Sequence, residues 1–151
     1  MKTLIKPTLL LLLMATAVFG KVPRGFKPTS EFEAVKAEAI EKKKLLTIVF
    51  KGSDDRCPNC AATMENGEKA TKSSSKLLFT RVSAFRNKKT GLPEEILSQV
   101  GSLADGASVY FYVFNPNDLK LVTKGSRTEL QSNKKTIREF KNTVRAAKKE
   151  L

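Results

Sequence analysis

The sequence has no histidine, no tryptophan and only two cysteines among its 151 residues. The missing histidine excludes Ser/His and Cys/His catalytic units, because both need an imidazole as the general base. A closed zinc site normally takes four Cys or His ligands, and the chain offers only Cys57 and Cys60. A structural zinc site would therefore need carboxylates such as Asp54 and Asp55, or a second chain, and no metal or other cofactor is expected.

What the chain does contain suits one globular domain, with 40% hydrophobic and 28% charged residues. It is strongly basic, with a formal net charge of +13. The lysines are scattered in short groups without aromatic residues between them, so we interpret them as solvated faces and expect no nucleic-acid partner. Attachment to an anionic surface stays open as an alternative, and steep loss of binding with salt would be its signature.

The first twenty residues have the pattern of a secretory signal peptide. Lys2 and Lys6 give a positive start, an apolar run covers residues 9–19, and the small residues Val18 and Gly20 flank a cleavage point. A membrane anchor is the alternative, but the run of eleven residues is well short of the roughly 20 that cross a bilayer. We therefore expect an exported protein, periplasmic or secreted, with no stable membrane insertion after cleavage.

The rest of the chain predicts a leader followed by one domain. Pro23, Gly25 and Pro28 predict a flexible leader without regular structure over residues 21–29. The domain over 30–151 should alternate helices and strands and then form a hairpin, which predicts a mixed sheet between helices. The expected helices cover 30–43, 61–72, 93–100 and 133–151, and the expected strands cover 45–50, 77–82, 109–114 and 119–123.

Three local patterns make these elements more specific. Ser30 and Glu33 match a capping box at the start of the first helix. Asn66-Gly67 predicts that the second helix is short or broken there. The apolar face of the first helix should contain Phe32, Val35, Ala39 and Ile40, and the aromatic residues that we interpret as core are Tyr110, Phe111, Tyr112 and Phe114.

The segment Cys57-Pro58-Asn59-Cys60 lies just after the expected central strand and at the start of the following helix. A helix N-terminus favours thiol chemistry, because its unpaired amides and positive dipole end stabilise a thiolate. Pro58 suits the first helical position. Cys57 should be the outer, attacking sulfur, and Cys60 should lie about one turn into the helix.

With this site and this order of elements, residues 30–151 resemble the thioredoxin-like family, in its branch of small exported proteins. The resemblance implies an α/β fold, namely a thioredoxin-like three-layer α/β/α sandwich with a mixed central β-sheet. It also implies that Cys57 is the nucleophile and Cys60 the resolving residue in exchange through a mixed disulfide. The partners would be exported proteins with cysteines and an unidentified redox partner. The substrate would be contacted by Arg56, Pro58, Asn59, Ala107 and Ser108.

The sequence departs from the family beside the cysteines. Arg56 stands where the family commonly has tryptophan, and its cation favours a thiolate at Cys57. Asp54 and Asp55 oppose that effect, so the direction of the Cys57 pKa shift stays open. Val49 replaces a buried acid that many thioredoxins carry, which leaves Cys60 without that helper for proton transfer.

A further departure is Ser108, which replaces the family's cis-proline. A trans bond is expected there, because a non-proline cis bond costs about 2.5 to 4 kcal/mol.

Two hypotheses about function follow. The first is a thiol-disulfide oxidoreductase that acts on exported proteins through Cys57 and Cys60. The second is a binding module that keeps the fold while its cysteine pair is structural, an alternative that Ser108 and Val49 favour. A disulfide across four residues removes only about 2 kcal/mol of unfolded-chain entropy, against about 3 for a 15-residue loop, so the pair is a poor staple. The oligomeric state stays open.

We predict that the mature exported protein begins near Lys21, because the signal pattern ends at Gly20. Expression in a secreting host, fractionation and N-terminal sequencing check this expectation. Recovery of a chain that begins at Met1 in the membrane fraction would contradict it.

Overall fold

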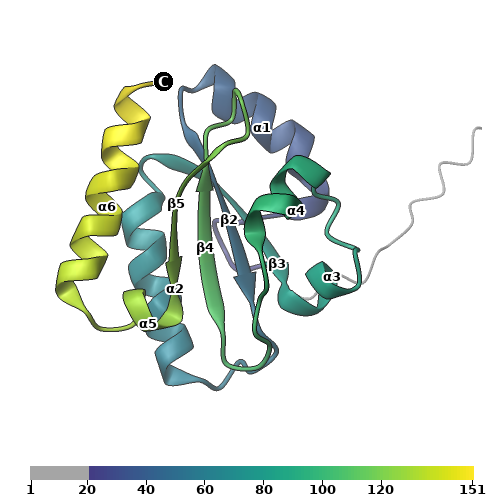
Figure 1. Cartoon of the computed structure of the whole chain (residues 1–151), viewed down its shortest axis with the longest axis vertical. Coiled ribbons are helices and arrows are strands. Elements are labelled where there is room, and N and C mark those ends of the chain that lie inside the picture. The colour runs from purple at the N-terminus through teal and green to yellow at the C-terminus, as the bar shows by residue number, and fades with distance from the viewer. Residues whose placement is uncertain (1–20) are drawn as a thin grey trace, which may run out of the picture.

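The computed structural model describes residues 21–151, so the predicted signal peptide and its cleavage point lie outside the described residues. The described chain forms a five-stranded mixed β-sheet with helices on both faces (Figure 1). This is the predicted fold class, a thioredoxin-like α/β/α sandwich. Within residues 21–151, no helix is both long enough and apolar enough to span a membrane.

Strand β2, Leu45–Lys51, is central, and its first six residues are all buried. Continuous burial explains its apolar composition, because a strand covered on both faces has no solvent side. It pairs in parallel with β3 and antiparallel with β4, so the predicted hairpin is confirmed. The strand order is β1-β3-β2-β4-β5, and the other strands are β1 (Lys27–Pro28), β3 (Ser75–Arg81), β4 (Val109–Phe114) and β5 (Leu121–Ser126).

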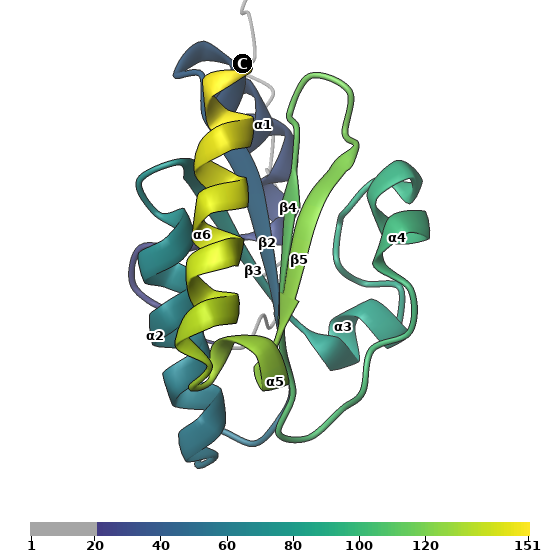
Figure 2. The same ribbon diagram turned by 60° about the vertical axis from the view of Figure 1, so that its left-hand side comes forward.

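Side chains of β2 alternate between two hydrophobic clusters. Leu46, Ile48 and Phe50 belong to one cluster, and Leu45 and Val49 to the other. The first cluster is completed by α1 (Phe32–Glu41), α3 (Val82–Arg86) and α4 (Glu94–Val100). The second is completed by α2 (Pro58–Thr71), α5 (Arg127–Leu130) and α6 (Lys134–Lys149). Figure 2 shows α2, α5 and α6 on one side of the sheet, across from α3 and α4.

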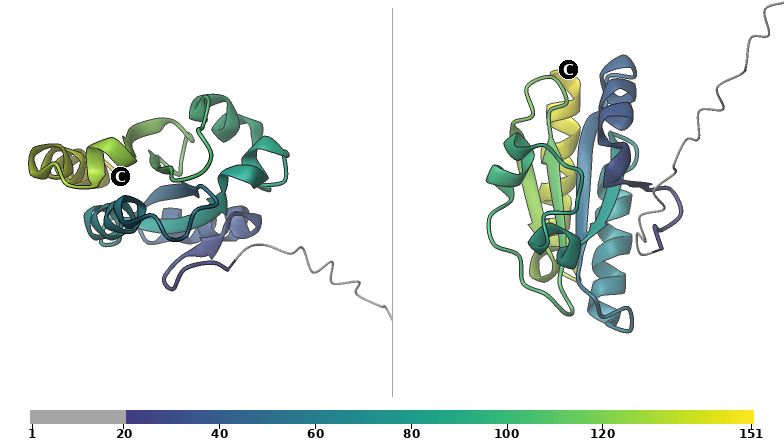
Figure 3. Two further views of the ribbon diagram at one scale, coloured as in Figure 1. Left: turned by 90° about the horizontal axis from the view of Figure 1, so that it is seen from below. Right: turned by 90° about the vertical axis from the view of Figure 1, so that its right-hand side faces the viewer.

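The segment predicted to be an irregular leader contributes to the sheet. Lys27 and Pro28 form β1 and pair with β3, and Phe26 is buried against Phe79. Pro28 is compatible with this position because β1 is an edge strand, where a missing N–H donor is tolerated. The expectation that residues 21–29 contain no regular element is therefore wrong for residues 27–29, which form β1 and the start of a 3-10 turn. Figure 3 shows this N-terminal segment across the molecule from the β4–β5 hairpin.

Helix α1 begins later than predicted. Thr29–Glu31 form a single 3-10 turn, and the residue that caps α1 is Glu31, with no side-chain hydrogen bond. The predicted capping box at Ser30 is therefore wrong. Phe32, Val35 and Ala39 are buried as expected, but Ile40 is 43% exposed, because the strip of α1 that faces the sheet is narrower than the predicted face.

Helix α2 continues through Asn66-Gly67, so the predicted break is wrong. Gly67 is buried, and a Cβ atom built on it would lie 2.4 Å from the ring of Phe111. The glycine therefore serves close packing of α2 on β4 rather than a turn. Asn66 is held by its side-chain amide, which donates to the carbonyl oxygen of Leu130 at 2.8 Å.

The other expected elements are present, but their bounds differ: β3 ends at Arg81 and Val82 starts α3, and β5 covers Leu121–Ser126 rather than residues 119–123. The aromatic residues of β4 are core, since Phe111, Tyr112 and Phe114 are buried and Tyr110 packs against them. Asn133 caps α6 by accepting from two backbone N–H groups. The sequence analysis missed the short helices α3 and α5, which are too brief to show a helical period.

We predict that Gly67→Ala lowers the free energy of unfolding by about 1 to 3 kcal/mol, because the added methyl group collides with the buried Phe111 ring. Helix propensity alone predicts the opposite sign, a gain of up to about 1 kcal/mol. Urea unfolding followed by circular dichroism measures the difference. Phe111→Leu should cost less in the Gly67→Ala background than alone, and an unchanged or raised stability of Gly67→Ala would contradict the assignment.

Candidate functional site: a cysteine pair at the start of α2

The first cysteine caps the helix that contains the second. Cys57 is the N-cap of α2, and its sulfur accepts a hydrogen bond from the backbone N–H of Cys60 at 3.2 Å. Pro58 follows as the first helical residue, where no N–H is needed. Cys57 is half-buried, whereas Cys60 is only 1% exposed, and both are free thiols. The predicted outer and inner sulfurs are confirmed in position.

The loop before β4 forms the opposite wall of the site. The Cys60 thiol donates to the carbonyl oxygen of Ala107 at 2.8 Å. Next to it, the Gly52 N–H donates to the carbonyl oxygen of Ser108 at 2.8 Å. A Cβ atom on Gly52 would lie 1.7 Å from the carbonyl oxygen of Gly106, so only glycine permits this approach of the two loops.

The peptide bond at Ser108 is trans, as expected, since residues 21–151 contain no cis peptide bond. Ala107 contacts Cys60 directly, and Ser108 is bonded through its carbonyl oxygen to Gly52. Pro58 and Asn59 are exposed on the surface between the two sulfurs. Whether these residues contact a substrate stays a prediction.

The two thiols differ in acidity. The pKa of Cys57 is lowered, chiefly by a hydrogen bond from the Cys60 side chain, with further help from the Cys60 backbone N–H and from Arg127. The pKa of Cys60 is raised to about 11, first by burial and then by its neighbour Cys57. The Cys60 thiol thus has two acceptors, Ala107 and Cys57, and the outer sulfur is the one that ionises first.

The cation that lowers the Cys57 pKa is Arg127, which the sequence analysis missed. We expected Arg56 to favour the thiolate, but its side chain is 98% exposed and lies 4.0 Å from Asp54. Arg56 is not among the groups that lower the Cys57 pKa, whereas Arg127 is. No local signal marks Arg127, because it comes to the cysteines only through the packing of α5 on α2.

The acidic residues before the cysteines are neutralised by neighbouring cations. Asp55 accepts two hydrogen bonds from Arg81, at 3.0 and 3.2 Å, and also pairs with Lys51. These partners lower the pKa of Asp55 to about 2. Arg81 also donates to the carbonyl oxygen of Gly52 at 2.8 Å, so the network ties the loop before Cys57 to the ends of β2 and β3.

Cys60 has no carboxylate helper. Val49 is fully buried in the same cluster as Cys60, where many thioredoxins would place an acid. The charge of Cys57 raises the Cys60 pKa, and two cations, Arg127 and Lys51, lower it. Lys51 is only 13% exposed and donates to the backbone carbonyl of Asp54 at 3.3 Å.

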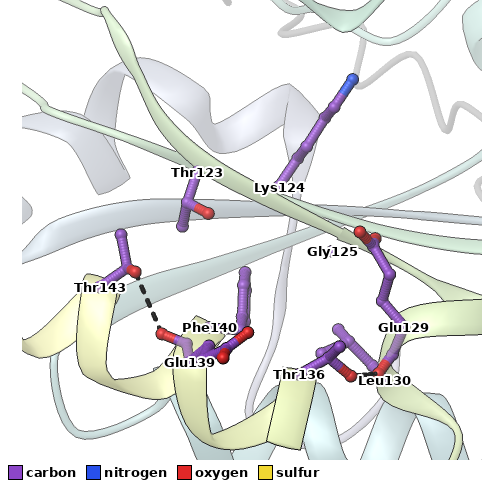
Figure 4. Close-up of a pocket in the computed structure, with 9 residues that line it drawn as sticks. All are labelled: Thr123, Lys124, Gly125, Glu129, Leu130, Thr136, Glu139, Phe140 and Thr143. Atoms are coloured by element: carbon purple, nitrogen blue, oxygen red, sulfur yellow. Dashed lines mark hydrogen bonds between the residues drawn. The ribbon is translucent and has the colours of Figure 1, made fainter. Parts of the chain in front are cut away.

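A pocket of about 190 Å³ lies between β5, α5 and α6 (Figure 4). Its lining includes the carboxylates of Glu129 and Glu139, the hydroxyl of Thr136 and the ring of Phe140. Neither cysteine lines it. Within residues 21–151, no group of three or more Cys, Asp or Glu side chains is placed to hold a metal ion.

No protein-family model, curated protein or solved structure matches this chain. The molecule is a small α/β domain with a mixed sheet, and its Cys57–Cys60 pair lies at the start of a helix. This arrangement is compatible with a redox function.

We predict that iodoacetamide at pH 7 modifies Cys57 and leaves Cys60 almost untouched. With a pKa of about 11, roughly one Cys60 in ten thousand is ionised at that pH, and its burial restricts access further. Peptide mass spectrometry after timed quenching measures both sites. In the Cys57→Ala variant, Cys60 should react only as the pH becomes strongly alkaline, and equal rates at the two cysteines of the native chain would contradict the assignment.

Proposed function

We propose that the protein is a thiol-disulfide oxidoreductase that acts on exported proteins through the Cys57/Cys60 pair. The observation that carries the proposal is the inequality of the two sulfurs. Cys57 is accessible, caps a helix and has a lowered pKa, whereas Cys60 is buried and has a raised pKa. A nucleophile followed by a protected resolving thiol needs this division.

The reaction begins when the Cys57 thiolate attacks one sulfur of a partner's disulfide. A bond forms between Cys57 and that sulfur, the partner's own S–S bond breaks, and the departing thiolate takes up a proton. Cys60 then loses its proton and attacks the Cys57 sulfur, which forms the Cys57–Cys60 disulfide and releases the partner as a dithiol. Two electrons have passed to the partner, and the same steps in reverse oxidise a dithiol partner.

Proton removal from Cys60 is the demanding step, because burial favours its neutral form. Formation of the mixed disulfide helps by removing the negative charge of Cys57, which is one cause of the raised Cys60 pKa. Arg127 and Lys51 stabilise the Cys60 thiolate further. These cations support the proposal in a site without a buried acid.

The setting of the pair suits a protein partner. Pro58 and Asn59 are exposed beside Cys57, so an extended segment carrying a disulfide has access to the outer sulfur. Exchange needs no cofactor beyond the cysteine pair itself, which stores the two electrons. Export of this activity to a periplasmic or secreted location rests on the N-terminal signal pattern.

We predict that Cys60→Ala accumulates partners bound covalently to Cys57, because the resolving attack is removed while the nucleophile remains. Non-reducing electrophoresis of the exported fraction should show adducts that separate on reduction. Cys57→Ala is the matched control and should trap few or no partners.

If both variants remain folded and neither traps a partner, the oxidoreductase proposal fails, and the hypothesis of a binding module with a structural cysteine pair replaces it. If only Cys57→Ala traps partners, the assigned roles of the two sulfurs are reversed.

A further inference from the structure

The short helix α5 joins β5 to α6 and begins at the cysteine site. Its cap is Ser126, the last residue of β5, which pairs with Tyr110 of β4. The Ser126 N–H donates to the Glu129 carboxylate at 2.8 Å, which completes a capping box. Strand β4, which follows the loop that contains Ala107, therefore also fixes, through its pairing with β5, the point at which Arg127 begins α5.

Helix α5 is held against α2 at two levels. Thr63 lies one helical turn after Cys60; its hydroxyl donates to the carbonyl oxygen of Asn59 at 2.7 Å and lies 3.4 Å from the carbonyl oxygen of Arg127. One turn further along α2, Asn66 donates to the carbonyl oxygen of Leu130 at 2.8 Å. A Cβ atom on Gly125 would lie 2.6 Å from the Leu130 side chain, so α5 also packs closely on β5. The backbone of Arg127 is thus held beside the cysteine helix from two sides.

Arg127 differs from the other cations near the sulfurs. Lys51 and Arg81 both pair with Asp55, and Arg56 faces Asp54. Within residues 21–151, Arg127 pairs with no carboxylate. Its charge therefore acts on the sulfurs without an acid to offset it, and it is half-buried, which weakens screening by solvent.

We propose that Arg127 is the cation that adds to the stabilisation of the Cys57 thiolate and thereby makes the cysteine pair more oxidising. The inference rests on the proposed function and assigns to Arg127 the role that its position in the sequence would give to Arg56. A cation beside a thiolate stabilises the reduced pair but gains nothing from the neutral disulfide. Loss of Arg127 should therefore favour the disulfide form.

Several charged and titratable groups surround Cys57, and the experiment must distinguish the effect of Arg127 from theirs. Cys60 lies on α2, Lys51 at the end of β2 and Arg127 on α5, while the preceding loop contributes Asp54, Asp55 and Arg56. Arg56→Ala is the matched control, because it removes the same charge from the immediate sequence neighbour of Cys57. Arg127→Lys keeps the charge and should retain most of the effect.

The experiment measures Cys57 alkylation by iodoacetamide as a function of pH, and the glutathione equilibrium of the pair, in the mature protein and the three variants. Arg127→Ala should slow alkylation at pH 7 roughly two- to fivefold, the range for a partly exposed ion pair, and raise the pH of half-maximal rate. Its glutathione equilibrium should shift toward the disulfide by a similar factor. Arg56→Ala should change neither quantity.

The inference is overturned if Arg127→Ala reacts like the native protein, or if Arg56→Ala shifts both quantities as much. Circular dichroism and urea unfolding establish that each variant is folded. Should Arg127→Ala fail to fold, Arg127→Gln, which keeps the polar stem, takes its place with the same expected shifts. Alkylation needs no partner, so a shift in Arg127→Ala together with no trapping in Cys60→Ala refutes the oxidoreductase proposal alone.

Discussion

The contact between the Cys60 thiol and the carbonyl oxygen of Ala107 is the constraint on which the site depends. It joins the helix that follows the central strand to the loop that precedes β4, and it satisfies a polar group that is almost fully buried. The contact requires close approach of the two loops, which Gly52 makes possible by having no Cβ atom. Because β2 and β4 are antiparallel neighbours, the loop after β2 and the loop before β4 lie at the same end of the sheet.

Full burial of one sulfur and half-burial of the other creates an electrostatic difference, although no carboxylate is buried within residues 21–151. Desolvation is the largest cause of the raised Cys60 pKa and the neighbouring Cys57 adds to it, while the hydrogen bond from the Cys60 side chain is the largest cause that lowers the pKa of Cys57. Val49 is buried in the same cluster as Cys60, so in the proposed exchange proton removal from Cys60 relies on the cations Arg127 and Lys51, which lower its pKa. The site therefore replaces a proton acceptor beside Cys60 with a local positive field.

Local features of the site were predictable from sequence, and long-range features were not. The buried strand β2, the proline at the start of α2 and the hairpin turn each follow from residues within a few positions of one another. Gly67 led to the wrong prediction of a break in α2, because the sequence does not distinguish a glycine needed for packing against Phe111 from a glycine needed for a turn. The sequence analysis missed β1 and α3, because such short elements show no hydrophobic periodicity and are fixed by neighbours that are distant in the sequence. The sequence analysis also missed Arg127, because only the packing of distant elements brings it near the cysteines.

Net charge and the charge at the site are governed separately in this molecule. The formal charge of +13 is spread over the surface, and near the cysteines Lys51, Arg56 and Arg81 each face an aspartate. Under the proposal for Arg127, the cation without an acidic partner contributes more to the field at the Cys57 sulfur than the total charge does. That cation lies on the connection between β5 and α6, far along the chain from the cysteines. Substitutions in this connection can therefore alter the chemistry of the pair without any change in the Cys-Pro-Asn-Cys segment, because the connection is held beside that segment by the packing of α5 on α2.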